Sequence, residues 1–217
     1  MSLLTQVSIP DAFIIFFLTV GPLKAIGLFA QATRGADPAL LRTLAWRSTS
    51  IATVIVLTVA VVGAVVLRQW RVSLPAMTIA GAIIFFFQAF QIIMAPPSAP
   101  SPPPSANNQQ SPPTLALAHF PLAIPALVTA PGIMAIVAFM AIARADWMQI
   151  GLVLTLLLLI MALNLMALLH VRLIFQYVSP TILLVLGWVM AVLQAALAAQ
   201  YLINALIRLG VLTSLVS

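Results

Sequence analysis

Long apolar runs without a charged residue are the feature that most limits what this chain can fold into. Residues 48–67 and 74–95 each span at least 20 positions and contain no Asp, Glu, Lys or Arg. About 20 apolar residues are enough for a helix to cross the hydrocarbon core of a bilayer. Segments of about ten alternating apolar and polar residues, which would favour a membrane barrel, do not occur in the sequence. These runs therefore predict membrane-spanning helices.

The scarcity of charge extends to the whole chain. Only 6% of its 217 residues are charged, whereas soluble domains carry about 25%, so the chain cannot cover a water-facing surface. We therefore expect an all-α integral membrane protein. The nine basic residues exceed the three acidic ones, and the arginines mostly flank the apolar runs, as in membrane proteins. Because no basic cluster is interleaved with aromatic residues, we expect no nucleic-acid partner.

The sequence predicts two groups of three spanning helices. The six segments that are long enough cover residues 10–33, 48–67, 74–95, 115–143, 147–169 and 180–207. Between the third and the fourth lies a stretch rich in Pro, Ser, Asn and Gln, a composition that favours extended, solvated backbone. We therefore expect a first three-helix repeat over residues 1–95, a linker over 96–114 and a second three-helix repeat over 115–217.

The two groups resemble each other at three places in the same order. The matching pairs are "GPLKAIGLF" (21–29) with "APGIMAIVAF" (130–139), "TRGAD" (33–37) with "ARAD" (143–146), and "GAIIFFFQA" (81–89) with "GWVMAVLQA" (187–195). Because three is odd, two copies of a three-helix unit must enter the membrane from opposite sides. The sequence therefore predicts an inverted repeat, an architecture that recurs in secondary transporters.

Prolines interrupt the first helix of each repeat, at Pro22 and at the Pro131–Gly132 pair. A proline removes a backbone donor, and unpaired backbone groups in hydrocarbon cost several kcal/mol each. Such breaks persist where the backbone is buried in protein or lines a wet cavity. The helix that resumes after a break presents free N–H groups and a positive dipole end, which suit a carboxylate. We therefore expect broken first and fourth helices that hold a solute at the midplane; simple kinks in packed helices are the alternative.

The predicted substrate-binding residues flank the two breaks or are amides that the repeat matches. They are Thr19, Gly21, Pro22, Lys24, Thr129, Ala130, Pro131, Gly132, Gln88 and Gln194. The two threonines precede the breaks and are expected to cap them or to contact a ligand. The two glutamines are expected to bond the solute or each other, and the alternative is that they only hold helices together.

Lys24 is an ionisable residue inside a predicted span. It lies about nine residues before the helix end near residue 33, which is roughly 13 Å at 1.5 Å per residue. An ionisable residue at such a depth is a candidate for function. The alternative is that the helix lies closer to the surface and Lys24 reaches the headgroups.

Several stretches together resemble the MarC family of six-helix bacterial inner-membrane proteins. They are "GPLKAIGLF" (21–29), "SLPAMTIAGAIIFF" (73–86), "FPLAIPALVTAPGI" (120–133) and "LGWVMAVLQAALAAQYLINAL" (186–206). The resemblance covers nearly the whole chain. It implies a multi-pass protein of the cell inner membrane that transports or exports small neutral amino acids.

The first-helix motif of this chain departs from the family pattern, Asp-Pro-x-Gly-Asn-x-Pro-x-Phe. Gly21, Lys24, Ala25 and Gly27 stand where that pattern has Asp, Gly, Asn and Pro, and Ala130 replaces the first Gly of a Gly-Pro-Gly in the fourth helix. The first break has therefore lost an acid and gained a base. We expect the Lys24 ammonium to replace a coupling cation or to select a more anionic ligand.

The sequence as a whole predicts a secondary transporter or exporter of small amino-acid-like solutes. The expected partners are the solute and the lipid bilayer, a homo-oligomer is compatible with the sequence, and no metal or cofactor is expected. Three acids at segment ends and two separated histidines form no acid–base pair or ligand cluster, so we do not expect an enzyme. Two alternatives stay open: a non-transporting membrane scaffold, and an intramembrane enzyme acting on a lipid-linked substrate.

Overall fold

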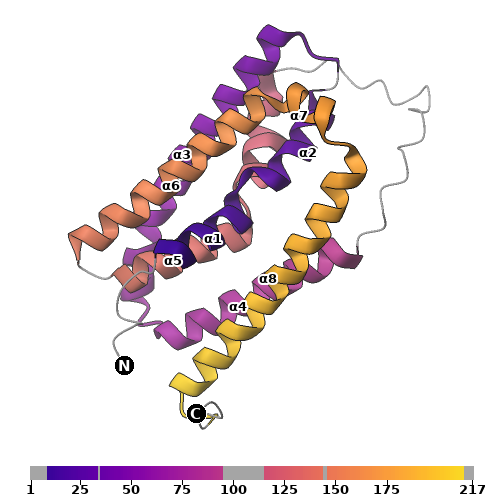
Figure 1. Cartoon of the computed structure of the whole chain (residues 1–217). Coiled ribbons are helices and arrows are strands. Elements are labelled where there is room, and N and C mark those ends of the chain that lie inside the picture. Colours follow the sequence, from indigo (N-terminus) through magenta and orange to yellow (C-terminus); the bar gives the residue numbers. More distant parts are fainter. Residues whose placement is uncertain (1–8, 34, 95–114, 144–145, 213–217) are drawn as a thin grey trace.

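The computed structural model describes residues 9–33, 35–94, 115–143 and 146–212, and every regular element among them is helical (Figure 1). The α-helices are α1 (Ile9–Val20), α2 (Pro22–Ala32), α3 (Pro38–Gln69), α4 (Leu74–Met94), α5 (Ala130–Ala143), α6 (Trp147–Leu169), α7 (Val171–Tyr177) and α8 (Pro180–Arg208). Before α5 lie a 3-10 helix, η1 (Leu115–Ala118), and a π-helix, η2 (His119–Leu127). The expected all-α class is confirmed, and the linker predicted over 96–114 lies outside the described residues.

Five helices in the described part of the chain are long and apolar enough to cross a membrane, whereas the sequence predicted six. They are Ile9–Ala32 (counted across α1 and α2), Pro38–Gly63, Leu74–Met94, Trp147–Leu169 and Leu184–Arg208. In the fourth predicted segment, 115–143, only the 14 residues of α5 are α-helical. Prolines at 121 and 125 provide no N–H for an α-helical ladder. The N–H of Val128 instead bonds the carbonyl of Ala123, five residues back, at 3.0 Å.

Two further boundaries differ from the sequence prediction. Helix α3 begins at Pro38 rather than at residue 48. Proline is well suited to the first helical position, and the Asp37 carboxylate accepts a hydrogen bond of 3.3 Å from the N–H of Ala39. The short helix α7 was not predicted, because its seven residues are too few to give a spanning signal.

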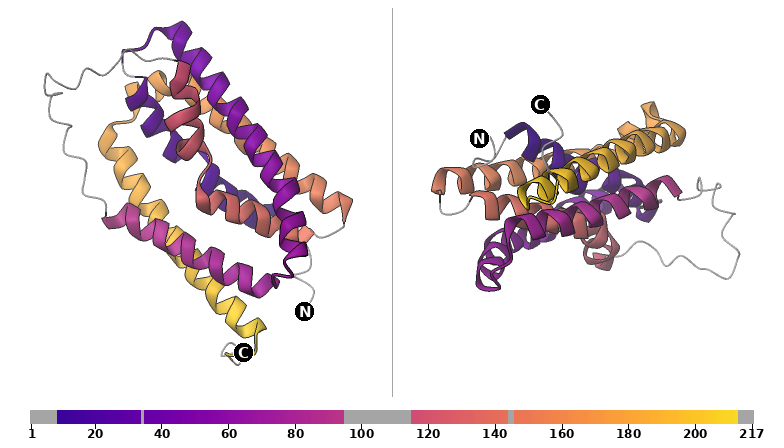
Figure 2. Two further views of the ribbon diagram at one scale, coloured as in Figure 1. Left: turned by 180° about the vertical axis from the view of Figure 1, so that it is seen from behind. Right: turned by 90° about the horizontal axis from the view of Figure 1, so that it is seen from below.

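Every helix of the first group packs against a segment of the second group. Helix α3 lies against α6, α4 against α8, α1 against α5, and α2 against η2. Figures 1 and 2 show the resulting arrangement: the α4–α8 pair lies on one side, the α3–α6 pair on the other, and α1, α2 and α5 lie between them. These central helices therefore place the two predicted breaks in the interior.

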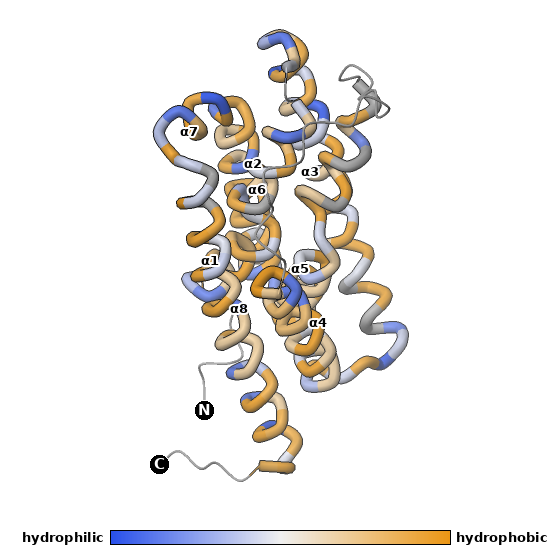
Figure 3. Tube along the Cα trace, turned by 90° about the vertical axis from the view of Figure 1, so that its right-hand side faces the viewer, coloured by the Kyte–Doolittle hydropathy of each residue, from blue (hydrophilic) through white to orange (hydrophobic). Residues whose placement is uncertain are grey.

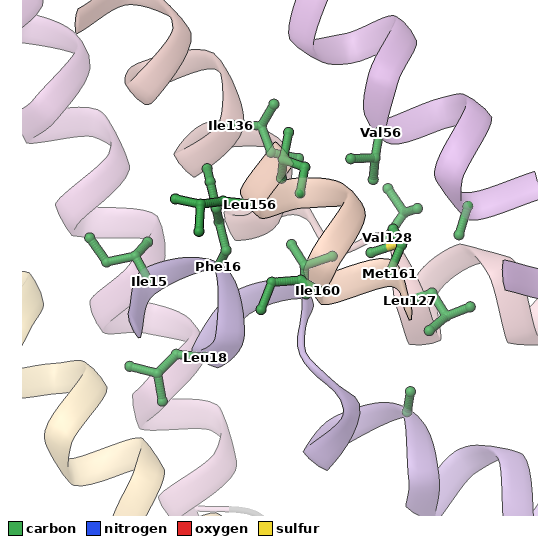
Figure 4. Close-up of a cluster of buried hydrophobic side chains, with 14 of the residues drawn as sticks. Ile15, Phe16, Leu18, Val56, Leu127, Val128, Ile136, Leu156, Ile160 and Met161 are labelled. Carbon is green, nitrogen blue, oxygen red and sulfur yellow. The ribbon is translucent and has the colours of Figure 1, made fainter. Parts of the chain in front are cut away.

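The interior around the breaks is a single apolar cluster. Figure 4 shows buried side chains from α1, α3, α5, α6 and the end of η2 that converge on one another, including Leu18, Val128 and Ile160. The Phe16 ring meets the Phe139 ring edge-on, with the centroids 5.2 Å apart. This packing fixes the position of α1 against α5.

The outer faces of the helices are also apolar. Exposed side chains include Val61, Val62, Phe86, Phe87 and Val192, and Figure 3 shows hydrophobic residues along most of the helical tube. An apolar surface of this extent is unfavourable in water and is matched by the hydrocarbon of a bilayer. The structure thus agrees with the membrane class that the composition predicted.

Candidate functional site

The first break lies between α1 and α2. Helix α1 ends at Val20, α2 begins at Pro22, and Gly21 between them has an extended backbone with φ −75° and ψ 171°. A Cβ atom at Gly21 would lie 1.9 Å from the carbonyl oxygen of Phe17, so only glycine fits there. Because Pro22 has no N–H, it cannot bond the carbonyl of Leu18 four residues back. The break therefore leaves carbonyl groups at the end of α1 that need other donors.

The second break lies between η2 and α5. Val128 is extended, with φ −104° and ψ 108°. The hydroxyl of Thr129 accepts a hydrogen bond of 3.2 Å from the N–H of Gly132, so Thr129 caps the beginning of α5. Pro131 lies in the first turn of that helix, where a missing N–H costs no hydrogen bond. Ala130, which precedes it, is exposed.

The two breaks are in direct contact. The Thr129 hydroxyl donates a hydrogen bond of 2.9 Å to the carbonyl of Thr19, across 110 residues of sequence. A Cβ atom at Gly132 would lie 2.6 Å from Cγ2 of Val20, so the absence of a side chain allows the close approach. The Thr19 hydroxyl is turned back to its own helix and donates to the carbonyl of Ile15 at 2.7 Å. Both threonine hydroxyls thus donate to backbone carbonyls.

Asn164 of α6 completes this junction and was not among the predicted site residues. Its side chain is fully buried, and its Nδ2 donates to the carbonyl of Val20 at 2.8 Å and to that of Ile160 at 3.1 Å. Its Oδ1 is buried and accepts no hydrogen bond from the described part of the chain. The sequence signal for this residue is a lone amide deep in an apolar helix.

The N-terminus of α2 is uncapped. No side chain caps it, so the N–H groups of its first turn have no partner within the helix. Lys24 lies in this turn, and its side chain is outside the described part of the structure. No side chain therefore neutralises the positive end of the α2 dipole, where Gly21 and Pro22 are buried.

Gln88 and Gln194 meet where α4 packs on α8. Gln194 is 1% exposed, and its Nε2 donates to Oε1 of Gln88 at 2.9 Å and to the carbonyl of Phe85 at 3.1 Å. Of the two arrangements expected from the sequence, the structure has the one in which the amides bond each other. Oε1 of Gln88 thus accepts its hydrogen bond from α8, 106 residues further along the chain.

A cavity of about 450 Å³ connects the glutamine pair with the first break. We call it the glutamine cavity; α1, α2, α4 and α8 line it, and its walls include Leu18 and Leu23 on either side of the break together with Gln88, Gln91, Gly187 and Gln194. Leu23 belongs to the uncapped first turn of α2. The cavity therefore lies between the first turn of α2 and three amide side chains, of which Gln194 is buried.

A second cavity, of about 180 Å³, lies between α1, α4, α5 and α8. We call it the charged cavity, because Asp11 and Arg208 both line it, and among the predicted site residues only Pro131 does so. The remaining six described site residues line neither cavity: Thr19, Gly21, Pro22, Thr129, Ala130 and Gly132. Within the described residues, no group of three or more His, Asp or Glu side chains could hold a metal ion.

Comparison with known proteins gives one match. A family model described as "MarC family integral membrane protein" matches residues 6–209, which is nearly the whole chain. No curated protein and no solved structure matches the chain.

Proposed function

The chain belongs to the MarC family of integral membrane proteins, and from this membership and the paired breaks we propose that it is a secondary transporter or exporter of small amino-acid-like solutes in the bacterial inner membrane. The proposal assigns it no catalytic step. It crosses the membrane six times, as two inverted repeats of three segments, with the η1–η2–α5 segment as the sixth crossing. The packing of every helix of the first group against a segment of the second group supports this arrangement.

The observation that carries the proposal is the position of the uncapped α2 N-terminus. Leu23 in its first turn lines the glutamine cavity. Free N–H groups and the positive dipole end suit the carboxylate of a solute. On the opposite wall, the oxygens of Gln88 and Gln91 are acceptors that suit an ammonium group. In this proposal the α2 N-terminus supplies donors and the glutamine oxygens supply acceptors, as a zwitterion requires.

Inverted-repeat transporters place their substrate at discontinuous helices near the midplane. Here the carbonyls released by the first break are bonded by Thr129 and Asn164, so the break is stable without a ligand. In this proposal the uncapped N-terminus of α2 binds the solute. A movement that separates α4–α8 from the central helices would open the cavity to one side of the membrane and then to the other.

The test is solute-induced thermal stabilisation of the purified protein, screened with small amino acids and small organic anions. Gly187→Leu is the matched variant, because Gly187 lines the glutamine cavity and a Cβ there meets no atom within 4 Å. We expect a solute that stabilises the wild type and fails to stabilise Gly187→Leu. If no solute in the screen stabilises the wild type more than Gly187→Leu, the glutamine cavity is not the site.

A membrane scaffold is the second candidate, and one observation favours it. The hydroxyls of Thr19 and Thr129 are both bonded to backbone carbonyls, as expected if the breaks are packing features. A scaffold predicts no stabilisation by any solute and no flux through reconstituted protein.

A further inference from the structure

The charged cavity lies on the other side of the glutamine pair from the glutamine cavity. On α4, residues 74–85 line the charged cavity and residues 88–92 line the glutamine cavity. On α8 the order is reversed, since residues 201–208 line the charged cavity and residues 187–194 the glutamine cavity. The two cavities are therefore separate spaces on either side of the α4–α8 contact.

The charged cavity is polar at one end and apolar at the other. Asp11, in the first turn of α1, and Arg208, the last residue of α8, are both exposed and mark its mouth. Phe85 and Pro131 line its deep end. Along α4, Phe85 lies eleven residues from Leu74 at the mouth, or about 16 Å at 1.5 Å per residue. The cavity therefore runs from one end of the helices toward the second break.

The two charges at the mouth have opposite signs and are not bonded to each other. Neither side chain makes an ion pair or a hydrogen bond within the described part of the chain. Tyr201 and Asn204 add polar groups beside them. An arginine and a carboxylate that face the same space without bonding present one anionic and one cationic contact to a ligand.

We propose that the charged cavity is a second binding site, which takes a zwitterion with an apolar body. The ammonium group of the ligand lies at Asp11, its acidic group at Arg208, and its apolar part extends along Met134 and Phe139 toward Phe85. A free amino acid with an apolar side chain has this chemistry, and so has a zwitterionic lipid headgroup with its chain. Binding here requires no transport, so this site goes beyond the function proposed above.

The first test uses purified full-length protein in detergent and isothermal titration with three probes: L-leucine, leucinamide, which has no carboxylate, and 4-methylpentanoate, which has no ammonium. We expect L-leucine to bind and each truncated probe to bind at least about ten-fold more weakly, the usual effect of losing one charged hydrogen-bonding contact. Phosphatidylethanolamine added to the detergent distinguishes the lipid source, because a lipid occupant displaces L-leucine.

Two substitutions test which charged side chain contacts the ammonium group of the ligand and which contacts its carboxylate. Asp11→Asn should weaken L-leucine about ten-fold and leave 4-methylpentanoate unchanged, because that probe has no ammonium to lose. Arg208→Gln should weaken L-leucine in the same way and leave leucinamide unchanged. Arg42→Gln, at an exposed position of α3, is the control that changes net charge without lining the cavity.

Substitutions at two glycines distinguish binding in the charged cavity from binding in the glutamine cavity. Gly81 lines the charged cavity, and a Cβ there meets only Met134 Cε, at 3.9 Å, so Gly81→Leu fills the space without a backbone clash. We expect Gly81→Leu to abolish L-leucine binding and Gly187→Leu to preserve it. The inference is overturned if neither L-leucine nor the lipid binds the wild type, or if binding survives Gly81→Leu, Asp11→Asn and Arg208→Gln. Solute flux that is lost only in Gly187→Leu would then leave the proposed transport function intact.

Discussion

The two breaks begin alike and end differently. At both, the helix that resumes has a proline in its first turn, Pro22 in α2 and Pro131 in α5. At the second break Thr129 caps the resumed helix, whereas at the first no side chain caps α2. The difference shows that a proline opens the resumed helix at both breaks, while a single polar residue decides whether that helix is capped.

The hydrogen bonds at the end of the helix that precedes each break also differ. The carbonyls of Thr19 and Val20 at the end of α1 are bonded by the side chains of Thr129 and Asn164, which lie 110 and 144 residues away in the sequence. At the end of η2, the N–H of Val128 bonds within the π-helix, to Ala123. The first break thus depends on contacts far away in sequence, and the second is largely stabilised by its own residues. Substitutions at both breaks test this difference in what stabilises them.

Gly21→Ala should have the largest effect. The new Cβ would lie 1.9 Å from the Phe17 carbonyl oxygen, a backbone atom that cannot move without distorting α1. We expect a loss of about 3 kcal/mol or more in unfolding free energy. At the second break Gly132→Ala should cost less, because its closest contact, at 2.6 Å, is the Val20 side chain. Denaturant unfolding in detergent measures both, with Gly27→Ala as the control, since a Cβ at Gly27 meets nothing within 4 Å. Equal losses at Gly21 and Gly27 would contradict this account.

Asn164→Leu should have the next largest effect on the unfolding free energy. It keeps a side chain of similar size and leaves the buried Val20 carbonyl without its donor. We expect a loss of about 1–2 kcal/mol in unfolding free energy. Thr155→Val in the same helix is the control, because the exposed Thr155 hydroxyl bonds only the carbonyl of Gly151 in its own helix. If the two variants unfold alike, Asn164 does not stabilise the break.

Thr129→Val should destabilise by about 1 kcal/mol, because it removes both the cap of α5 and the bond to the Thr19 carbonyl. Thr19→Val removes only a bond within α1 and should change the unfolding free energy by less than about 0.5 kcal/mol. Thermal unfolding of the two variants side by side measures the difference. The opposite ranking would show that the contact between the breaks contributes nothing.

Lys24→Gly should change ligand preference more than stability. The substitution introduces a glycine into α2, which costs about 1 kcal/mol at most. If the Lys24 ammonium replaces a coupling cation or selects an anionic solute, the variant should change its ion dependence or its substrate charge preference. Lys24→Gln controls for the change in helix propensity. Transport that is unchanged on both counts would exclude this role for Lys24.

The features that the sequence predicted are those encoded locally. Hydropathy gives the apolar helices, and prolines give the interruptions after Val20 and before Ala130. The repeat suggested that Gln88 and Gln194 meet, because residues at matched positions of two related units lie near the axis between them.

The features that the sequence did not predict depend on tertiary contacts. Asn164 bonds the Val20 carbonyl across 144 residues of sequence, and no local pattern encodes that distance. The π-helix η2 arises where two prolines four residues apart prevent an α-helical ladder, and a hydropathy profile does not detect this. The charged cavity joins the first turn of α1 to the end of α8, two positions at opposite ends of the chain.

The central claim is that the glutamine cavity beside the open α2 N-terminus binds a solute during transport. The most direct measurement is exchange of radiolabelled L-alanine and L-lactate in proteoliposomes that contain wild-type protein or Gly187→Leu at equal density. The account predicts that the wild type exchanges at least one of these solutes and that Gly187→Leu does not. Equal exchange by both proteins, or wild-type exchange no faster than in protein-free liposomes, would contradict it.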